Sequence, residues 1–279
     1  MHPLIPFFEP PAFTLPFNGP SGDPLSIHGF GIMVALGVLL GSQLSMRKAR
    51  NDGLDPEVLN RLVTWIIVGI FVGGHLGHAL FYQPEYYMKH PIELLYVWDG
   101  LSSFGGFIAS AILCVIFFKK ERKDFWMYGD TVAFGLQLGW ALGRVGCFLA
   151  HDHSGTPTEF WLGVYGMCPD RPQTVACHDL GLYEAIWSGL VILPLFLYFD
   201  KKPRFPGFFI GVMCLLYGPM RLFMDIFRSP VTDTRYLGLT PAQYGSVALT
   251  AIGVWILYSR RNKTPVRELM QQITTPAAT

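Results

Sequence analysis

The sequence predicts an all-α polytopic membrane protein with seven transmembrane helices. Apolar residues make up 51% of the 279 residues and charged residues only 15%, whereas about one-quarter of the residues of a soluble domain are charged. Apolar segments of roughly 20 residues also alternate with short basic connections. The composition therefore excludes an ordinary soluble domain and favours a helical bundle in a lipid bilayer.

The apolar segments share a length close to what an α-helix needs to cross about 30 Å of hydrocarbon. They are Ile27–Leu44, Leu62–Phe81, Phe104–Phe118, Thr131–Leu149, Leu182–Phe199, Phe208–Phe227 and Pro241–Tyr258. We expect three parts from this pattern: an arm rich in Pro and Phe over residues 1–26, a seven-helix membrane domain over 27–258 and a tail over 259–279. The arm is expected to be either an amphipathic segment on the membrane surface or unstructured, because its prolines prevent a continuous helix.

Basic residues predict the orientation of the bundle. With seven crossings, 15 of the 21 Lys and Arg fall on one side, in residues 46–61, 119–130, 200–205 and 259–279. The positive-inside rule makes that side cytoplasmic, so the N-terminus lies outside and the C-terminus inside. Residues 1–26 contain no Lys or Arg, so we expect no cleavable signal peptide there. A periplasmic loop region is expected around residues 150–180.

Two cysteines fall in that outer loop region. Cys168 and Cys177 could form a disulfide, because an oxidising compartment permits one. Two unpaired thiols are the alternative.

The segment from Gly143 to Gly155, GRVGCFLAHDHSG, carries the densest polar cluster at the end of an apolar run. Arg144 is followed by His151, Asp152 and His153. A charge at the centre of a membrane helix costs about 3 kcal/mol, so ionisable residues in such runs are functional candidates by default. We therefore expect a polar site at the outer end of this helix.

Further polar residues are assigned to the same outer half by the predicted orientation. They are His28, His75 and His78, His178 to Glu184, and Arg221, Asp225 and Arg228. The turn that precedes the third span adds the paired glycines Gly105 and Gly106. Each has an ordinary structural explanation as well. The two histidines of the second span share a helix face and could hold a metal or donate hydrogen bonds inside the bundle. The paired glycines could let backbone approach a lipid headgroup, or could allow close helix packing.

Arg221 and Asp225 are four residues apart, which predicts an ion pair on one face of a helix. A pair that merely ties helices together is one interpretation. Phosphate binding is the other interpretation. The presence of three arginines, Arg144, Arg221 and Arg228, favours it, because a guanidinium group can donate two parallel hydrogen bonds to a phosphate. A lipid headgroup is the phosphate expected at this depth.

From His28 to Tyr258 the sequence resembles the bacterial prolipoprotein diacylglyceryl transferase family. Five blocks carry the resemblance, in order: Gly73-Gly74-His75-Leu76-Gly77, the turn WDGLSSFGG, Gly143-Arg144-Val145-Gly146, His178 with Tyr183-Glu184-Ala185, and Tyr217-Gly218 with Arg221, Asp225 and Arg228-Ser229-Pro230. Gln243 fits the family's last-span glutamine. The chain departs from the family at Phe104, where a histidine is usual, and at Cys147, Ala150 and His151, where asparagines and a glutamate are usual.

The resemblance implies transfer of a diacylglyceryl group from phosphatidylglycerol to the cysteine thiol of a prolipoprotein at the outer face of the inner membrane. The partners implied are phosphatidylglycerol, prolipoprotein signal peptides with a lipobox cysteine, and membrane lipid, with no nucleic acid, cofactor or metal. Arg144, Arg221 and Arg228 would clamp the phosphate. With Phe104 unable to act as a base, His151, His153 or His178 would accept the thiol proton, and Asp152 or Asp179 could orient it.

The remaining expected substrate contacts are Asp225, Tyr183, Glu184, Gly105, Gly106, Gly146, His28 and His75. Two other functions stay open from the sequence. One is a metal-dependent membrane enzyme that uses the histidine clusters. The other is a non-catalytic relative that binds lipid or lipoprotein.

Overall fold

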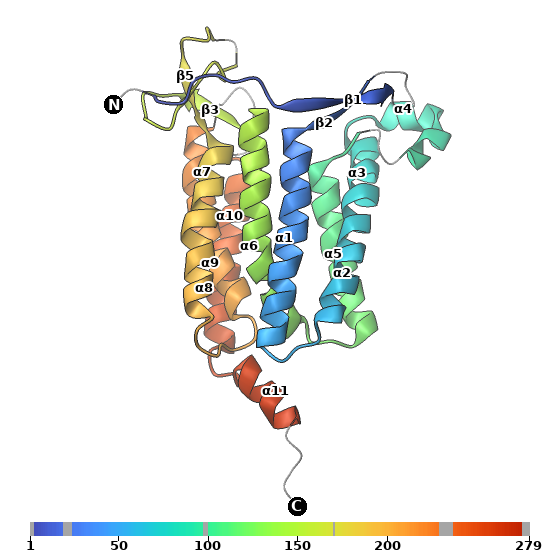
Figure 1. The fold of residues 1–279 in the computed structure, drawn as a ribbon, viewed down its shortest axis with the longest axis vertical. Coiled ribbons are helices and arrows are strands. Elements are labelled where there is room, and N and C mark those ends of the chain that lie inside the picture. The colour runs from blue at the N-terminus through green and yellow to red at the C-terminus, as the bar shows by residue number, and fades with distance from the viewer. Residues whose placement is uncertain (1–2, 19–23, 97–99, 170, 229–236, 275–279) are drawn as a thin grey trace, which may run out of the picture. The chain divides into compact units, whose positions relative to one another are not determined.

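The computed structural model describes residues 3–18, 24–96, 100–169, 171–228 and 237–274 (Figure 1). The chain divides into two compact units. One comprises residues 1–45 and 130–279, and the other comprises residues 46–129. We call them the first and the second unit and describe each by itself.

Helices form at all seven of the predicted apolar ranges. They are α1 (Gly29–Asn51), a run of α2 (Pro56–Val68), the π-helical turn η1 (Gly69–Gly73) and α3 (Gly74–Phe81), then α5 (Ser103–Glu121), α6 (Phe125–Ala150), a run of α7 (Leu180–Ile186), η3 (Trp187–Ile192) and α8 (Leu193–Phe199), α9 (Phe208–Met224) continued by η4 (Asp225–Phe227), and α10 (Pro241–Arg260). Shorter helices are α4 (Pro84–Lys89), η2 (Pro91–Leu95) and α11 (Val266–Thr274).

Within the described residues, five of these helical runs are long and apolar enough to cross a membrane: Gly29–Asn51, Pro56–Phe81, Phe125–Ala150, Leu180–Phe199 and Phe208–Phe227. The chain is therefore a multi-pass membrane protein by length and composition of its helices.

Strands correct the prediction that the protein is all-α. In the N-terminal segment, β1 (Ala12–Asn18) pairs antiparallel with β2 (Pro24–His28). This pairing also corrects the expectation of an amphipathic or unstructured arm, and it makes His28 the last residue of a strand rather than part of the first helix. Proline is compatible with strand ends and edges, where its missing N–H is not needed. The prolines that exclude a helix here therefore do not exclude a strand pair.

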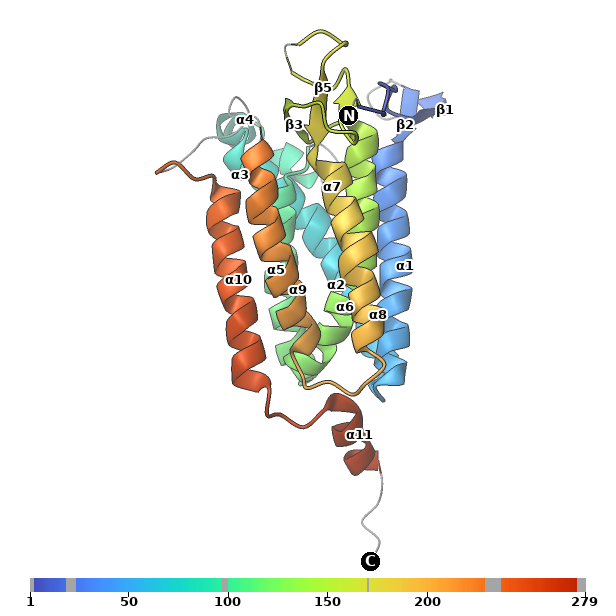
Figure 2. The same cartoon turned by 90° about the vertical axis from the view of Figure 1, so that its left-hand side faces the viewer.

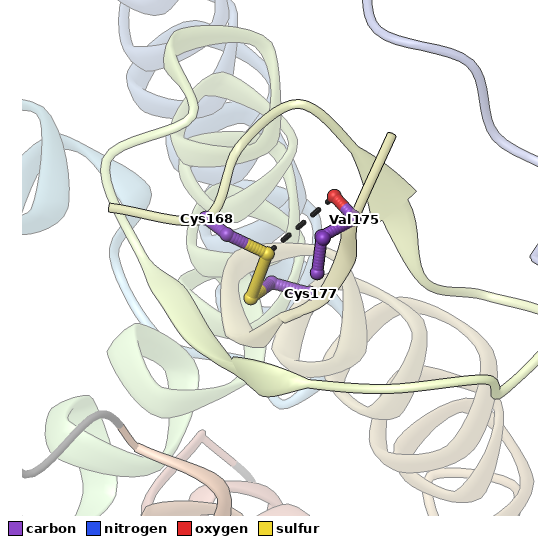
Figure 3. Close-up of a disulfide and its surroundings, with 3 residues drawn as sticks. All are labelled: Cys168, Val175 and Cys177. Carbon is purple, nitrogen blue, oxygen red and sulfur yellow. Dashed lines mark hydrogen bonds between the residues drawn. A yellow bond between two sulfur atoms is a disulfide. The ribbon is translucent and has the colours of Figure 1, made fainter. Parts of the chain in front are cut away.

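A second, three-stranded sheet lies between α6 and α7. Its strands β3 (Ser154–Pro157), β4 (Val164–Tyr165) and β5 (Ala176–Asp179) are arranged in the order β3-β5-β4. Cys168 and Cys177 form the disulfide that the sequence permitted, which fixes the connection before β5 to the sheet (Figure 3). The cystine is buried with Val164 and Met167 in a small core of its own.

Glycines let the helices of the first unit approach one another closely. A Cβ atom on Gly37 of α1 would lie 2.8 Å from the carbonyl oxygen of Gly139 in α6, and one on Gly41 would lie 2.9 Å from that of Gly135. Such small residues at a spacing of four are typical of membrane helix interfaces. Helices α9 and α10 also run side by side (Figure 2), and the core near the start of α9 is built from Phe134, Phe196 and Phe209.

A buried carboxylate begins α9. Asp130 of α6 is 3% exposed, and its two oxygens accept hydrogen bonds from the backbone N–H groups of Gly207 at 2.8 Å and Ile210 at 3.0 Å. Helix N-termini present unpaired N–H groups that favour a negative charge. Asp130 therefore joins α6 to α9 at one end of the unit.

The second unit packs α5 against the run from α2 to α3. A Cβ atom on Gly105 of α5 would lie 2.4 Å from the carbonyl oxygen of Gly73 and 2.7 Å from Cα of Gly77. Of the two interpretations that the sequence left open for these glycines, close helix packing accounts for Gly105.

Candidate functional site

A buried carboxylate joins two arginines in the first unit. Glu184 of α7 is 1% exposed. One of its oxygens lies 2.9 Å from Nε of Arg144 in α6, and the other lies 3.2 Å from Nη1 of Arg221 in α9. The hydroxyl of Tyr217, one turn before Arg221 on α9, donates to the same carboxylate at 2.6 Å. Three helices are thus connected through one glutamate.

Asp225 extends this cluster toward α10. It lies 3.5 Å from Nη2 of Arg221, as the spacing of four predicted, and it is fully buried. It also accepts a hydrogen bond from the hydroxyl of Thr240, the N-cap residue of α10. Thr240 and Gln243 form a reciprocal capping box that begins this helix. The cluster is therefore placed by four helices, α6, α7, α9 and α10.

The charges of this cluster balance. Two guanidinium groups, Arg144 and Arg221, face two carboxylates, Glu184 and Asp225. The side chains of both arginines are 13% exposed, so part of each remains accessible from outside the protein. A guanidinium carries five N–H donors, so the contacts to the carboxylates orient each arginine without saturating it. The arrangement can hold an anion such as a phosphate.

His153 connects the cluster to Asp152. Its Nε2 lies 3.0 Å from Nη1 of Arg144, and its Nδ1 lies 2.5 Å from Oδ1 of Asp152. Because a guanidinium can only donate, Nε2 must accept, and Nδ1 carries the proton and donates to the carboxylate. This network assigns the tautomer of His153, and the lone pair on its Nε2 accepts the hydrogen bond from Arg144.

Among the described residues, one group has its potential metal ligands close together: Cys147, Asp152 and His153, whose ligand atoms lie within 4.8 Å of one another. Arg144, however, lies 3.8 Å from the sulfur of Cys147 and 3.0 Å from Nε2 of His153. A cation placed there would face a permanent positive charge. These residues therefore fit a metal poorly.

His178 and Asp179 end β5 and begin α7. Nδ1 of His178 lies 2.8 Å from the hydroxyl of Tyr183, and its ring contacts Phe227 at 4.6 Å between centroids. Burial lowers the pKa of His178 below its usual value of 6.5, so the imidazole is neutral at pH 7. Asp179 accepts a hydrogen bond from the backbone N–H of Leu182 at 2.8 Å and caps α7. Burial raises its pKa to about 6.

His151 lies against the N-terminal segment. Its Nε2 lies 2.9 Å from the carbonyl oxygen of Phe8, and its ring stacks on Phe7. Since a carbonyl only accepts, Nε2 carries the proton. Its Nδ1 is buried with no hydrogen-bond partner among the described residues. This histidine therefore holds the N-terminal segment in place.

Of the other predicted residues of the first unit, Arg228 lies near His178, and Gly146 has a packing role. Arg228 follows η4, and its backbone bridges Gly155. Gly155 in turn lies close to His178 and to the carbonyl oxygen of Phe227. A Cβ atom on Gly146 would lie 3.1 Å from the ring of Phe30, so that glycine serves the packing of α6 on α1.

Three predicted residues belong to the second unit. His75 is fully buried, with Nδ1 3.2 Å from the carbonyl oxygen of Gly100 and its ring against the edge of Tyr87. Gly105 and Gly106 pack on η1 and α3. The side chain of Phe104 and the motif residues Trp98, Asp99, Ser229 and Pro230 lie outside the described residues.

Three residues that contact the cluster were not predicted from the sequence. They are Tyr217, Thr240 and Trp140, whose ring lies 4.5 Å below the guanidinium of Arg144. Tyr217 is four residues before Arg221 and Trp140 four before Arg144, so helical spacing could have found both. Thr240 with Gln243 has the spacing of a capping box.

The helices and this buried cluster of arginines and carboxylates define a multi-pass membrane protein with a polar site inside its helical bundle. A family model described as prolipoprotein diacylglyceryl transferase matches residues 21–259. The chain belongs to this family, which confirms the resemblance noted in the sequence.

Named relatives agree with the family model. The chain is similar to the phosphatidylglycerol–prolipoprotein diacylglyceryl transferases of Nitrosomonas europaea (32% identity, covering 91% of this chain and 90% of the relative), Aromatoleum aromaticum (32%, 92% and 97%) and Solidesulfovibrio magneticus (33%, 91% and 96%).

Proposed function

We propose that this protein transfers the diacylglyceryl group of phosphatidylglycerol to the cysteine thiol of a prolipoprotein. The observation that carries the proposal is the pair of arginines held by Glu184 in a chain that belongs to the transferase family. Its relatives are named for phosphatidylglycerol and prolipoprotein.

The reaction requires a base and a group of positive charge. The base takes the proton of the thiol, and the thiolate attacks the carbon of the diacylated glycerol that carries the phosphate. A carbon–sulfur bond forms, the carbon–oxygen bond breaks, and glycerol phosphate leaves with the electron pair. A thiol has a pKa near 8.5, so it needs the base, and the departing phosphate needs positive charge nearby.

Arg144, Arg221 and Arg228 supply that charge in our proposal. Arg144 and Arg221 are oriented by Glu184, which limits the conformational entropy lost when they bind phosphate. Arg228 lies at the end of the same helical run as Arg221. Tyr183, Glu184 and Asp225 position these groups.

His178 is the proposed base among the three histidines. The proton-accepting nitrogen of His151 is buried, and that of His153 faces Arg144. The partner of His178 is a tyrosine hydroxyl, which can either donate or accept. The lowered pKa of His178 leaves its ring neutral and able to accept a proton at pH 7.

The proposed setting is the bacterial inner membrane, which the chain crosses seven times. The arm over 1–26 and the loop region around 150–180 are periplasmic, and the tail over 259–279 is cytoplasmic. The helices at seven predicted ranges and the distribution of Lys and Arg support this topology. The second substrate is a prolipoprotein signal peptide with a lipobox cysteine.

The test is transfer by the purified protein, with phosphatidylglycerol and a lipobox peptide in detergent micelles. We expect a thioether-linked product, measured as a mass increase of one diacylglyceryl group on the peptide. A peptide with Ser in place of the cysteine is the control substrate. No product, under conditions in which a relative is active, would overturn the proposal.

Variants separate the proposed roles. Arg144→Ala and Arg228→Ala should each lower the transfer rate at least about 100-fold, as loss of a charge-stabilising donor does in other enzymes. Lys202→Ala, an exposed cation outside the cluster, should not. His178→Ala should abolish transfer, whereas His151→Ala should retain transfer chemistry. A full rate in both arginine variants would remove the phosphate clamp.

A further inference from the structure

A basic pocket lies at the end of α5 in the second unit, and none of its lining residues belongs to the candidate site. Its cavity measures about 420 Å³ and is lined by Val115, Phe118, Lys119, Arg122, Lys123 and Phe125. Half of these residues are cationic and half are apolar. No carboxylate lines the cavity.

The three cations are available to a ligand. Lys119, Arg122 and Lys123 are exposed, and no ion pair of their side chains occurs among the described residues. The neighbouring carboxylates have other partners: Glu121 binds Arg61 at 2.7 Å, and Asp124 accepts the backbone N–H of Met127 at 2.9 Å. The three cations outnumber Asp124, the one neighbouring carboxylate that has no cationic partner among the described residues, so the pocket has a net positive charge.

An apolar stripe leads to this pocket along α5. Ile108, Ile112 and Val115 are 44%, 54% and 45% exposed, and they are followed by Lys119 and Arg122 at the same alternating spacing of four and three residues. Residues at this spacing share one face of a helix. One face of α5 is thus apolar from Ile108 to Val115 and carries Lys119 near its end, and Arg122, the left-handed C-cap residue that follows the helix, is a second cation lining the same pocket.

This combination matches one kind of ligand. An anionic phospholipid has a phosphate that Lys and Arg bind and acyl chains that cover exposed apolar surface. A soluble anion would use the cations and leave the stripe uncovered. A neutral lipid would use the stripe and leave the cations unpaired.

We propose that this pocket binds the headgroup phosphate of an anionic phospholipid whose acyl chains lie along Ile108, Ile112 and Val115. It is a binding site for lipid as a structural ligand, and it does not depend on the transfer reaction. By the proposed topology the lipid belongs to the cytoplasmic leaflet.

Photo-crosslinking tests the site directly. The full-length protein is placed in phosphatidylcholine nanodiscs containing a phosphatidic acid probe with a photoreactive acyl chain. Phosphatidic acid has no glycerol headgroup, so it is not a donor for the proposed reaction. Peptide mass analysis should find the label on α5, around Ile108 to Val115. A phosphatidylcholine probe with the same chain should label this segment much less.

The matched variants each remove three positive charges. Lys119→Gln/Arg122→Gln/Lys123→Gln should weaken binding of phosphatidic acid on the order of 100-fold. Lys201→Gln/Lys202→Gln/Lys263→Gln, which changes other basic segments, should leave it unchanged. Both variants should keep the transfer activity, so failure of this site is distinguishable from failure of the proposed function.

The site would be overturned by equal loss of binding in both variants, by equal labelling with the phosphatidylcholine probe, or by label placed mainly on other helices. Competition with inorganic phosphate completes the experiment. Retention of the label in excess phosphate supports a lipid ligand, and its complete displacement identifies a site for free phosphate instead.

Discussion

Glu184 determines the geometry of the candidate site because it is shared by groups from two other helices. Arg144, Tyr217 and Arg221 all bind its carboxylate. The pair Arg221 and Asp225 was predictable, since a spacing of four places both on one face. The partners of Glu184 were not, since they are 40, 33 and 37 residues away along the sequence.

Removing the charge of Glu184 should destabilise the protein strongly. Glu184→Gln leaves two arginines with one carboxylate fewer in a buried setting, and breaking a buried pair costs about 3–5 kcal/mol. Thermal unfolding in micelles measures the loss. Glu121→Gln is the control, because its pair with Arg61 is exposed to solvent and such pairs contribute little to stability. Equal unfolding temperatures of the two variants would contradict this role.

Asp179 should make stability depend on pH. Its folded pKa of about 6 lies above the ordinary value of 3.8, so the folded state binds the proton more tightly. The stabilisation is complete below pH 3.8 and is lost as pH rises through 6, by roughly 3 kcal/mol. Asp179→Asn can still accept from Leu182 but does not titrate.

The measurement is the unfolding temperature of both proteins from pH 4 to pH 7. We expect the difference between the Asn variant and the wild type to shift in favour of the variant as pH rises. A difference that is constant with pH would show that the carboxyl group keeps its ordinary pKa.

At the scale of the elements, hydropathy predicted where helices form but not what lies between them. Each predicted range contains a helix. The strand pair β1–β2 was missed because its prolines exclude a helix without indicating a strand, and the sheet β3-β5-β4 was missed because its strands are only two to four residues long. The π-helical turns η1 and η3 also have no signal in apolar periodicity.

The contact between α1 and α6 should depend on Gly37. In Gly37→Ala the new Cβ atom would lie 2.8 Å from the carbonyl oxygen of Gly139, and backbone cannot move aside easily. We expect a loss of about 1–3 kcal/mol, as for other overpacked sites. Gly31→Ala on the same helix has nothing within 4 Å and should be neutral or stabilising. The unfolding temperatures of the two variants in micelles are compared, and an unchanged unfolding temperature of Gly37→Ala would contradict the close contact.

At the scale of the whole molecule, the predicted orientation is the property to test. Reporter fusions should place the N-terminus in the periplasm and the C-terminus in the cytoplasm, because 15 of the 21 Lys and Arg then face the cytoplasm. Alkaline phosphatase, active outside, and a fluorescent protein, active inside, read the two sides. Both ends on one side would rule out seven crossings.

The sequence by itself determined the membrane class, the position of each long helix and the family, because hydropathy and motif spacing are properties of consecutive residues. It also supplied most of the polar residues of the site. Only the tertiary structure decided which of these residues meet: Glu184 joins two arginines, and His151 holds the N-terminal segment instead of joining them. The physical reason is that helix packing, not spacing along the chain, decides which charges share a buried environment.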